Sequence, residues 1–111
     1  MDYGIAVVVA HMACEAATER AMSNAFAKRQ VQYLEDSITS LLSGYNLGND
    51  RHRKLFTALT GDSIEKTGFW SDFTRSAGQR NKIIHNGPIA IESEAVSSLA
   101  ACRLFVSHVH P

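Results

Sequence analysis

The chain is short of residues that break helices, cross-link small folds or give a protein a strong charge of one sign. Proline occurs only at positions 88 and 111 of the 111 residues. Two cysteines are too few for a disulfide scaffold or a four-cysteine zinc site. Eleven basic and eleven acidic residues give a net charge of +0, which excludes the general basic surface of histone-like proteins. A local cationic patch is still compatible with this balance.

Long apolar runs are also missing. The run at residues 5–10 is too short for a membrane span, and no basic segment of the signal-peptide type precedes it. We therefore expect a cytoplasmic, reduced protein with no membrane partner. Cys14 and Cys102 each lie in an apolar helical context, where we expect buried free thiols.

What the chain does have is helical periodicity. Hydrophobic residues make up 45% and charged residues 20%, which is a globular composition. Apolar residues recur at spacings of three and four, and strand alternation is nowhere sustained. We predict an all-α fold with a single domain, residues 1–111, that is one bundle of four or five helices.

The helices are expected at 3–27, 31–42, 50–60, 63–86 and 92–109. Asp50 is the expected N-cap and Gly61 the stop of the short third helix. Gly68 and Gly78 predict a break or kink in the fourth. The first helix carries apolar residues on most of its circumference, including Ile5, Val9 and Met12 on one face and a run of alanines on another, which predicts a central helix packed on two or more sides.

The most informative stretch is residues 78–87. It places Arg80, Asn81, Lys82 and His85 on the last turns of a helix, which Ile83 and Ile84 are expected to anchor in the core. Residues 73–91 contain three basic residues and no acidic one, so a neutral protein carries a local charge of +3 here. Arginine suits phosphate, and histidine can exchange a proton near neutral pH.

Spacing limits what one chain can do with these groups. Arg80 and His85 are five residues apart, roughly 140° around an ideal helix, so they do not obviously converge on one atom. Two chains packed about a two-fold axis along this helix could bring them together. The alternative is a surface arginine and a histidine favoured by the helix dipole.

The run Arg80-Asn81-Lys82-Ile83-Ile84-His85 resembles the R-x4-6-H motif of the HEPN (higher eukaryotes and prokaryotes nucleotide-binding) family. The following Asn86-Gly87 and the late position in an all-helical chain also match. The resemblance implies a helical bundle, commonly a dimer, in which many members are metal-independent ribonucleases. It makes Arg80 and His85 the catalytic pair and Asn81 the polar residue beside them. Other members lack activity and serve as toxin, antiviral or scaffolding modules.

The resulting expectation is a metal-independent endoribonuclease that acts on RNA as a homodimer, without a cofactor. The alternative is a non-catalytic dimerisation, nucleotide-binding or partner-binding module of a toxin–antitoxin or phage-defence system, with an antitoxin or defence protein as partner. Lys82 is a supporting residue. Glu15 either supports Arg80 through an ion pair or pairs at the surface with Arg20 or Lys28.

Other polar residues admit two interpretations each. His11 and Glu15 have the spacing of metal ligands, but no second pair accompanies them, and no metal site is predicted. The basic run 51–54 either contacts phosphate or is a solvated face. Trp70, with Phe69 and Phe73, is either core packing or a platform for base stacking. His108 and His110 are expected in a frayed tail.

Overall fold

The computed structural model describes residues 2–87 and 91–109 and shows only helices among them. Five α-helices and two 3-10 turns follow in the order α1 (Tyr3–Lys28), η1 (Gln32–Leu34), α2 (Glu35–Leu42), α3 (Asp50–Thr60), η2 (Ile64–Lys66), α4 (Trp70–Asn86) and α5 (Glu92–Val109). The predicted all-α bundle is confirmed. None of the helices in these ranges has the length and apolarity needed to cross a membrane.

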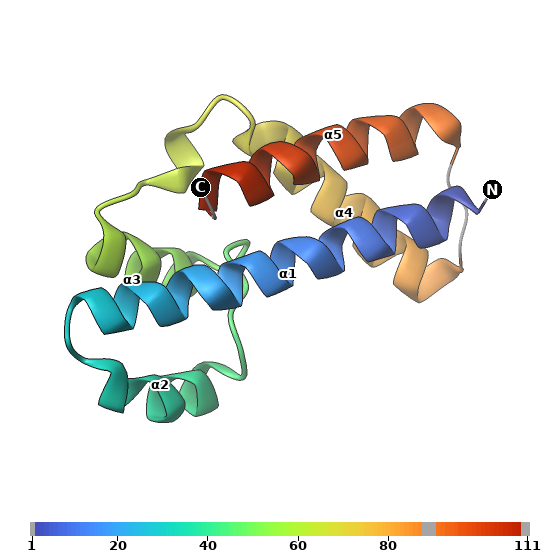
Figure 1. Ribbon diagram of the computed structural model, residues 1–111. Coiled ribbons are helices and arrows are strands. Elements are labelled where there is room, and N and C mark those ends of the chain that lie inside the picture. The colour runs from blue at the N-terminus through green and yellow to red at the C-terminus, as the bar shows by residue number, and fades with distance from the viewer. Residues whose placement is uncertain (1, 88–90, 110–111) are drawn as a thin grey trace.

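Helices α1 and α5 lie side by side and run in the same direction (Figure 1). Cys14 contacts Cys102, 88 residues later, and Val7 belongs to the same buried cluster as Ala95, at the same separation. Helix α4 packs against both, antiparallel to α5, since Phe73 meets Phe105 while Gln79 meets Ser98. This three-helix arrangement carries the candidate site.

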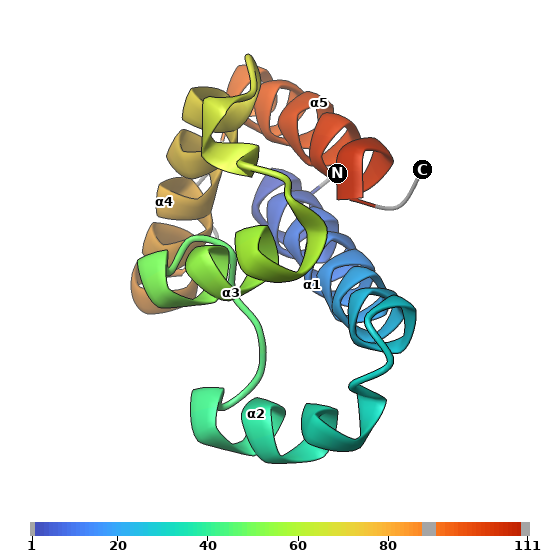
Figure 2. The same cartoon turned by 90° about the vertical axis from the view of Figure 1, so that its left-hand side faces the viewer.

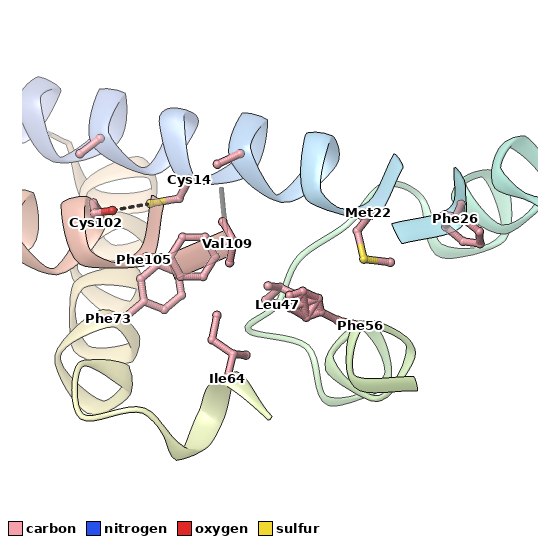
Figure 3. Close-up of a cluster of buried hydrophobic side chains, with 12 residues drawn as sticks. Cys14, Met22, Phe26, Leu47, Phe56, Ile64, Phe73, Cys102, Phe105 and Val109 are labelled. Atoms are coloured by element: carbon pink, nitrogen blue, oxygen red, sulfur yellow. Dashed lines mark hydrogen bonds between the residues drawn. The ribbon is translucent and has the colours of Figure 1, made fainter. Parts of the chain in front are cut away.

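The core lies where these three helices meet the segment 47–64 (Figure 3). The rings of Phe73 and Phe105 stack with centroids 4.3 Å apart. Leu47, Phe56 and Ile64 are buried against this centre from the other segments. Alanines on α1 contribute little volume, so α5 can approach its backbone closely. The alanine face of α1 is therefore the buried one.

Helix α1 contacts α5, α4 and α3, as predicted for a central helix packed on two or more sides, but one of its apolar faces stays outside. Ile5, Val9 and Met12 are all exposed. The physical reason is that α4 and α5 both cover the face that carries Val7, Ala10, Cys14 and Ala17. On α4 likewise, Ile83 is buried whereas Ile84, 100° further round the helix, is 56% exposed.

The residues that cap and end the helices lie at or next to the predicted positions. Asn49, not Asp50, is the N-cap of α3, because its side chain accepts from the backbone N–H groups of Arg51 and His52. Gly61 ends α3 with a φ of 77°, a conformation that glycine adopts without strain. The expected break falls at Gly68, between η2 and α4, and α4 continues through Gly78. Pro88 lies outside the described residues.

Helix α2 is peripheral. It lies at the edge of the molecule, away from α4 and α5 (Figure 2). None of its residues is buried, and Leu41 is 83% exposed. The predicted helix over 31–42 is divided into η1 and α2, and Ser43 ends it in the left-handed conformation with a φ of 57°. This element therefore adds little to the core.

Candidate functional site

The arginine of the motif is held by a carboxylate of another helix. Arg80 lies on α4, and its Nη1 is 3.2 Å from Oε1 of Glu15 on α1. Of the two interpretations of Glu15, the pair with Arg80 is the one present. The Arg80 side chain is 25% exposed and that of Glu15 is 55% exposed. A pair this exposed contributes little to stability, so its main effect is to orient the guanidinium.

One donor of Arg80 is left without a partner. Its Nε is buried and makes no hydrogen bond within residues 2–87 and 91–109. Buried N–H donors are rarely unpaired, because losing water without gaining an acceptor is unfavourable. A small shift of the side chain towards an anion or a water would satisfy this donor.

Asn81, Lys82 and His85 are all exposed on the same helix. None of the three makes a side-chain hydrogen bond or ion pair within the described part of the chain. His85 lies in the last turn of α4. No contact joins its ring to Arg80, as the angle of roughly 140° between them predicts. The structure thus groups the expected residues on one helix but does not bring Arg80 and His85 together.

A buried polar cluster lies beneath the site. Nε2 of His11, on α1, is 2.7 Å from Oγ of Ser76 on α4. The Cys14 thiol donates to the carbonyl oxygen of Cys102, 3.8 Å away. Both cysteines are free and buried, as predicted. The interaction with Cys102 and burial raise the pKa of Cys14 far above its usual range, whereas the neighbouring side chains of Cys14 and His11 lower the pKa of Cys102.

The metal interpretation of His11 and Glu15 gains no support from this geometry. Glu15 pairs with Arg80, and the imidazole of His11 is turned into the protein, where it is 4% exposed and meets Ser76 and Phe73. Within the ranges that the structure describes, no three metal-binding side chains lie together. His11 is part of the polar interior between α1 and α4.

A cleft of about 340 Å³ opens next to Glu15 and Asn81. Its walls are α1, α4 and the loop 45–48, with His11, Thr18, Asn46, Phe73 and Gly78 among the lining residues. No local sequence pattern indicates this cleft, because three segments far apart in the chain form it. The only local signal was Gly78, which weakens a helix without ending it.

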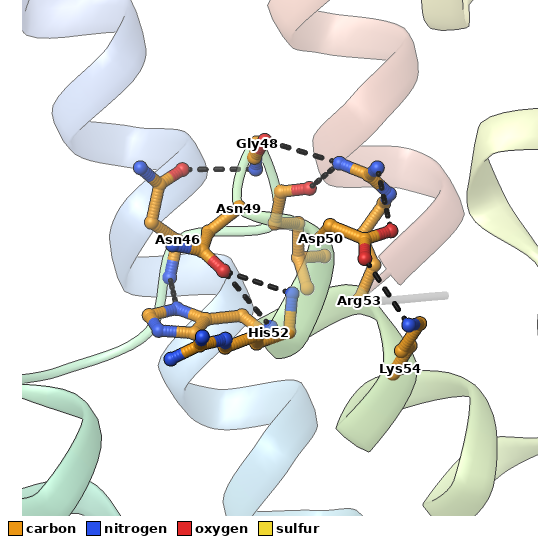
Figure 4. Close-up of polar contacts among 9 residues, drawn as sticks. Asn46, Gly48, Asn49, Asp50, His52, Arg53 and Lys54 are labelled. Carbon is orange, nitrogen blue, oxygen red and sulfur yellow. Dashed lines mark hydrogen bonds and ion pairs between the residues drawn. The ribbon is translucent and has the colours of Figure 1, made fainter.

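The basic run 51–54 holds the loop wall of this cleft (Figure 4). The backbone N–H of Asn46 donates to Nδ1 of the buried His52 at 2.8 Å. Nη1 of Arg53 donates to the carbonyl oxygens of Leu47 and Gly48, at 3.0 and 3.1 Å. His52 and Arg53 are therefore engaged within the chain, and Arg51 and Lys54 form the solvated face.

Two other residues from the sequence analysis have defined contacts. Trp70 is half-buried: it packs against Phe73 at the edge of the core, and the guanidinium of Arg53 lies 5.3 Å from the centre of its ring, which fits the core-packing interpretation. The frayed tail is wrong for His108, which lies in α5 with its Nε2 2.6 Å from Oδ2 of Asp62. This contact across the bundle orders the end of the helix. His110 lies outside the described residues.

Comparison with known proteins gives no relative. No family model, curated protein or solved structure matches the chain.

Proposed function

We propose that the chain is a HEPN-like, metal-independent endoribonuclease that acts on RNA as a homodimer. The observation that carries this proposal is the arrangement on α4, where an arginine oriented by Glu15 is followed by exposed Asn81, Lys82 and His85. Phosphate binding, positive charge and proton transfer are the three things that cleavage of RNA by its own 2′-hydroxyl requires.

Each residue has a distinct role in this mechanism. His85 takes the proton from the ribose 2′-hydroxyl, or gives one to the departing 5′-oxygen. Arg80 stabilises the negative charge that gathers on the phosphorus centre as the 2′-oxygen bonds to it and the 5′-oxygen leaves. Asn81 orients a phosphate oxygen or the imidazole, and Lys82 attracts the RNA backbone.

A dimer would bring an arginine and a histidine together, which a single chain does not do. Ile84 lies directly before His85 and is exposed, although an apolar side chain gains free energy when it leaves water. A two-fold contact that covers Ile84 would bring the α4 helices of two chains together. His85 of one chain would then lie near Arg80 of the partner, which overcomes their divergence on one helix.

Cleavage assays test this proposal. We expect single-stranded RNA to be cut in the presence of EDTA and to carry 2′,3′-cyclic phosphate ends, while the matching DNA is not cut. His85→Ala should lower the rate by roughly 10²–10⁴, since it removes the acid–base group. Arg51→Ala, an exposed cation on α3, is the control and should cut like the parent. Equal cleavage by His85→Ala would place the activity elsewhere.

The non-catalytic module is supported by a different observation. Besides Ile84, the exposed apolar side chains include Ile5, Val9 and Met12 on α1 and Val96 and Leu99 on α5. Such side chains favour association whether or not catalysis occurs. A dimer that binds RNA without cutting it, or that instead binds a protein of a toxin–antitoxin or phage-defence system, would replace the enzyme.

A further inference from the structure

The cleft between α1, α4 and the loop 45–48 has no role in the phosphate chemistry above. We propose that it binds one unpaired base of the RNA, next to the phosphate at Arg80, and that it selects bases with an exocyclic amino group over uracil. This inference rests on the proposed function, because it takes RNA as the ligand.

Position connects the cleft with Arg80. Glu15 lines the cleft and forms the ion pair with Arg80 at 3.2 Å, while Asn81, the next residue along α4, lines it too. A phosphate at the guanidinium therefore leaves the attached nucleoside at the mouth of the cleft. The volume of about 340 Å³ lies in the range of small-molecule sites, roughly 300–1,000 Å³.

The charge of the lining determines which part of a nucleotide can enter. Glu15 places a carboxylate at the cleft, and no lysine or arginine is among the lining residues that the structure describes. A phosphate would be repelled there, so the uncharged base is the part that fits. The largely buried side chains of His11 and Phe73 also line this space, and they limit how deep a planar ligand can enter.

Hydrogen-bonding groups at the cleft are free to meet a base. Of the two Glu15 oxygens, only Oε1 is engaged within the described residues, and it faces Arg80. Oε2 can only accept, so it favours a base edge that donates through an amino group, as in adenine, cytosine or guanine. Uracil presents two carbonyl oxygens beside its single N–H, and their lone pairs would face the carboxylate. The amide groups of Asn46 and Asn81 can complete the recognition.

The loop wall is fixed before any ligand arrives. Its backbone is held by His52 and Arg53, and the side-chain oxygen of Asn46 accepts from the N–H of Gly48 at 2.9 Å (Figure 4). One lone pair of the Asn46 amide oxygen is thereby used, and its NH₂ group is available to donate to a ligand. A fixed wall lowers the entropy lost on binding.

Gly78 keeps the opposite wall open. It lies in the interior of α4 and lines the cleft, yet a Cβ atom added there would meet nothing within 4 Å. Packing within the described residues therefore does not require glycine at this position. A flat ring that lies close to the helix backbone would require it.

The test uses 2′-O-methyl RNA pentamers of adenosine, cytidine or uridine, which cannot be cleaved through the 2′-oxygen. We expect the protein to bind the adenosine and cytidine pentamers about tenfold more tightly than the uridine pentamer. Gly78→Leu fills the cleft and should abolish this preference while leaving the weaker binding of uridine unchanged. Thr74→Leu fills it from the adjacent turn and should do the same. Ala100→Leu, at an exposed position on α5 outside the cleft, is the control.

Equal affinity for the three pentamers would overturn the inference, as would a base preference that survives in a folded Gly78→Leu protein. The two proposals fail separately. Cleavage without base preference would support the ribonuclease proposal and contradict the base site. The opposite result is a protein that does not cut RNA but shows a base preference that Gly78→Leu abolishes. That result would support the base site and contradict the enzyme.

Discussion

At the scale of single residues, the ion pair between Arg80 and Glu15 is the contact that gives the motif a geometry. The two side chains come from helices 65 positions apart in the chain. Since a half-exposed pair adds at most about 1 kcal/mol to folding, its value lies in where it directs the guanidinium. Replacing either residue of this pair should therefore alter function more than stability.

Arg80→Ala should weaken the binding of RNA as well as its turnover, because the guanidinium would contact phosphate before and during the reaction. The slope of log affinity against log salt concentration should become less steep by about one unit, the loss of one phosphate contact. Fluorescence anisotropy with a labelled RNA at several salt concentrations measures this slope. Arg75→Ala removes an exposed arginine of the same helix, paired with Asp72, and should leave the slope nearly unchanged.

Gly78→Ala should stabilise the protein, because alanine favours a helix interior over glycine by about 1 kcal/mol and the added methyl group meets open space. For a domain of this size we expect the melting temperature to rise by roughly 4 °C. Gly61→Ala is the contrasting variant: its φ of 77° is unfavourable for alanine, so its melting temperature should fall. Thermal denaturation followed by circular dichroism compares the two.

At the scale of elements, the loop 45–49 and the start of α3 form one unit. His52 and Arg53 come from the helix, and their side chains accept from or donate to the backbone of the loop. Those loop groups would otherwise need water or another partner. A helix thus fixes a loop that has no regular structure of its own.

His52→Ala should loosen this unit. It leaves the N–H of Asn46 without its acceptor and creates a small cavity, with an expected loss of about 1–3 kcal/mol in the free energy of unfolding. Arg51→Ala, at the exposed neighbouring position, should change stability by less than about 0.5 kcal/mol. Urea titration of both variants measures the difference. Equal stability would show that the loop does not depend on His52.

Helix α2 should be the least protected of the helices. It buries no residue, whereas α1 and α5 bury several against each other. Local opening requires little free energy where few apolar contacts are lost. In native-state hydrogen exchange we expect the α2 amides to exchange before those in the middle of α1 and α5. Simultaneous exchange of all helices would mean that the bundle opens only as a whole.

At the scale of the whole molecule, one side of the bundle is covered and the other is not. Helices α4 and α5 bury the alanine face of α1, and Ile5, Val9 and Met12 remain outside. With zero net charge, repulsion between copies is weak, so exposed apolar surface can lead to association. The homodimer proposed through Ile84 on α4 relies on the same two general properties, weak repulsion and exposed apolar side chains.

Ile84→Glu tests the assembly. A charge in an apolar two-fold contact would face its own copy from the partner, so the variant should sediment as a monomer at micromolar concentration and lose cleavage of RNA. Leu41→Glu alters a still more exposed leucine on α2 and should leave both properties unchanged. A parent protein that is itself monomeric at this concentration would contradict the dimer.

Local sequence patterns are enough to place most of the helices. Periodicity and the near absence of proline predicted α1 and α5 within one residue, and Gly61 marked the end of α3. These features depend on local interactions, since a cap, a turn or an i to i+4 spacing involves residues close in the chain. The motif 80–85 is local in the same sense, and one helix presents all of it.

Which helix faces are buried depends on contacts between helices that are distant in the chain. Each of Ile84 and Val9 is as apolar as its buried neighbours Ile83 and Val7, so hydrophobicity alone does not choose between them. Which face is buried depends on where α4 and α5 cross α1. The alanine face of α1 is the buried one because small residues allow the closest approach. The ion pair of Glu15 and the cleft beside Asn46 join segments distant in sequence, and no local pattern records which distant segments will meet.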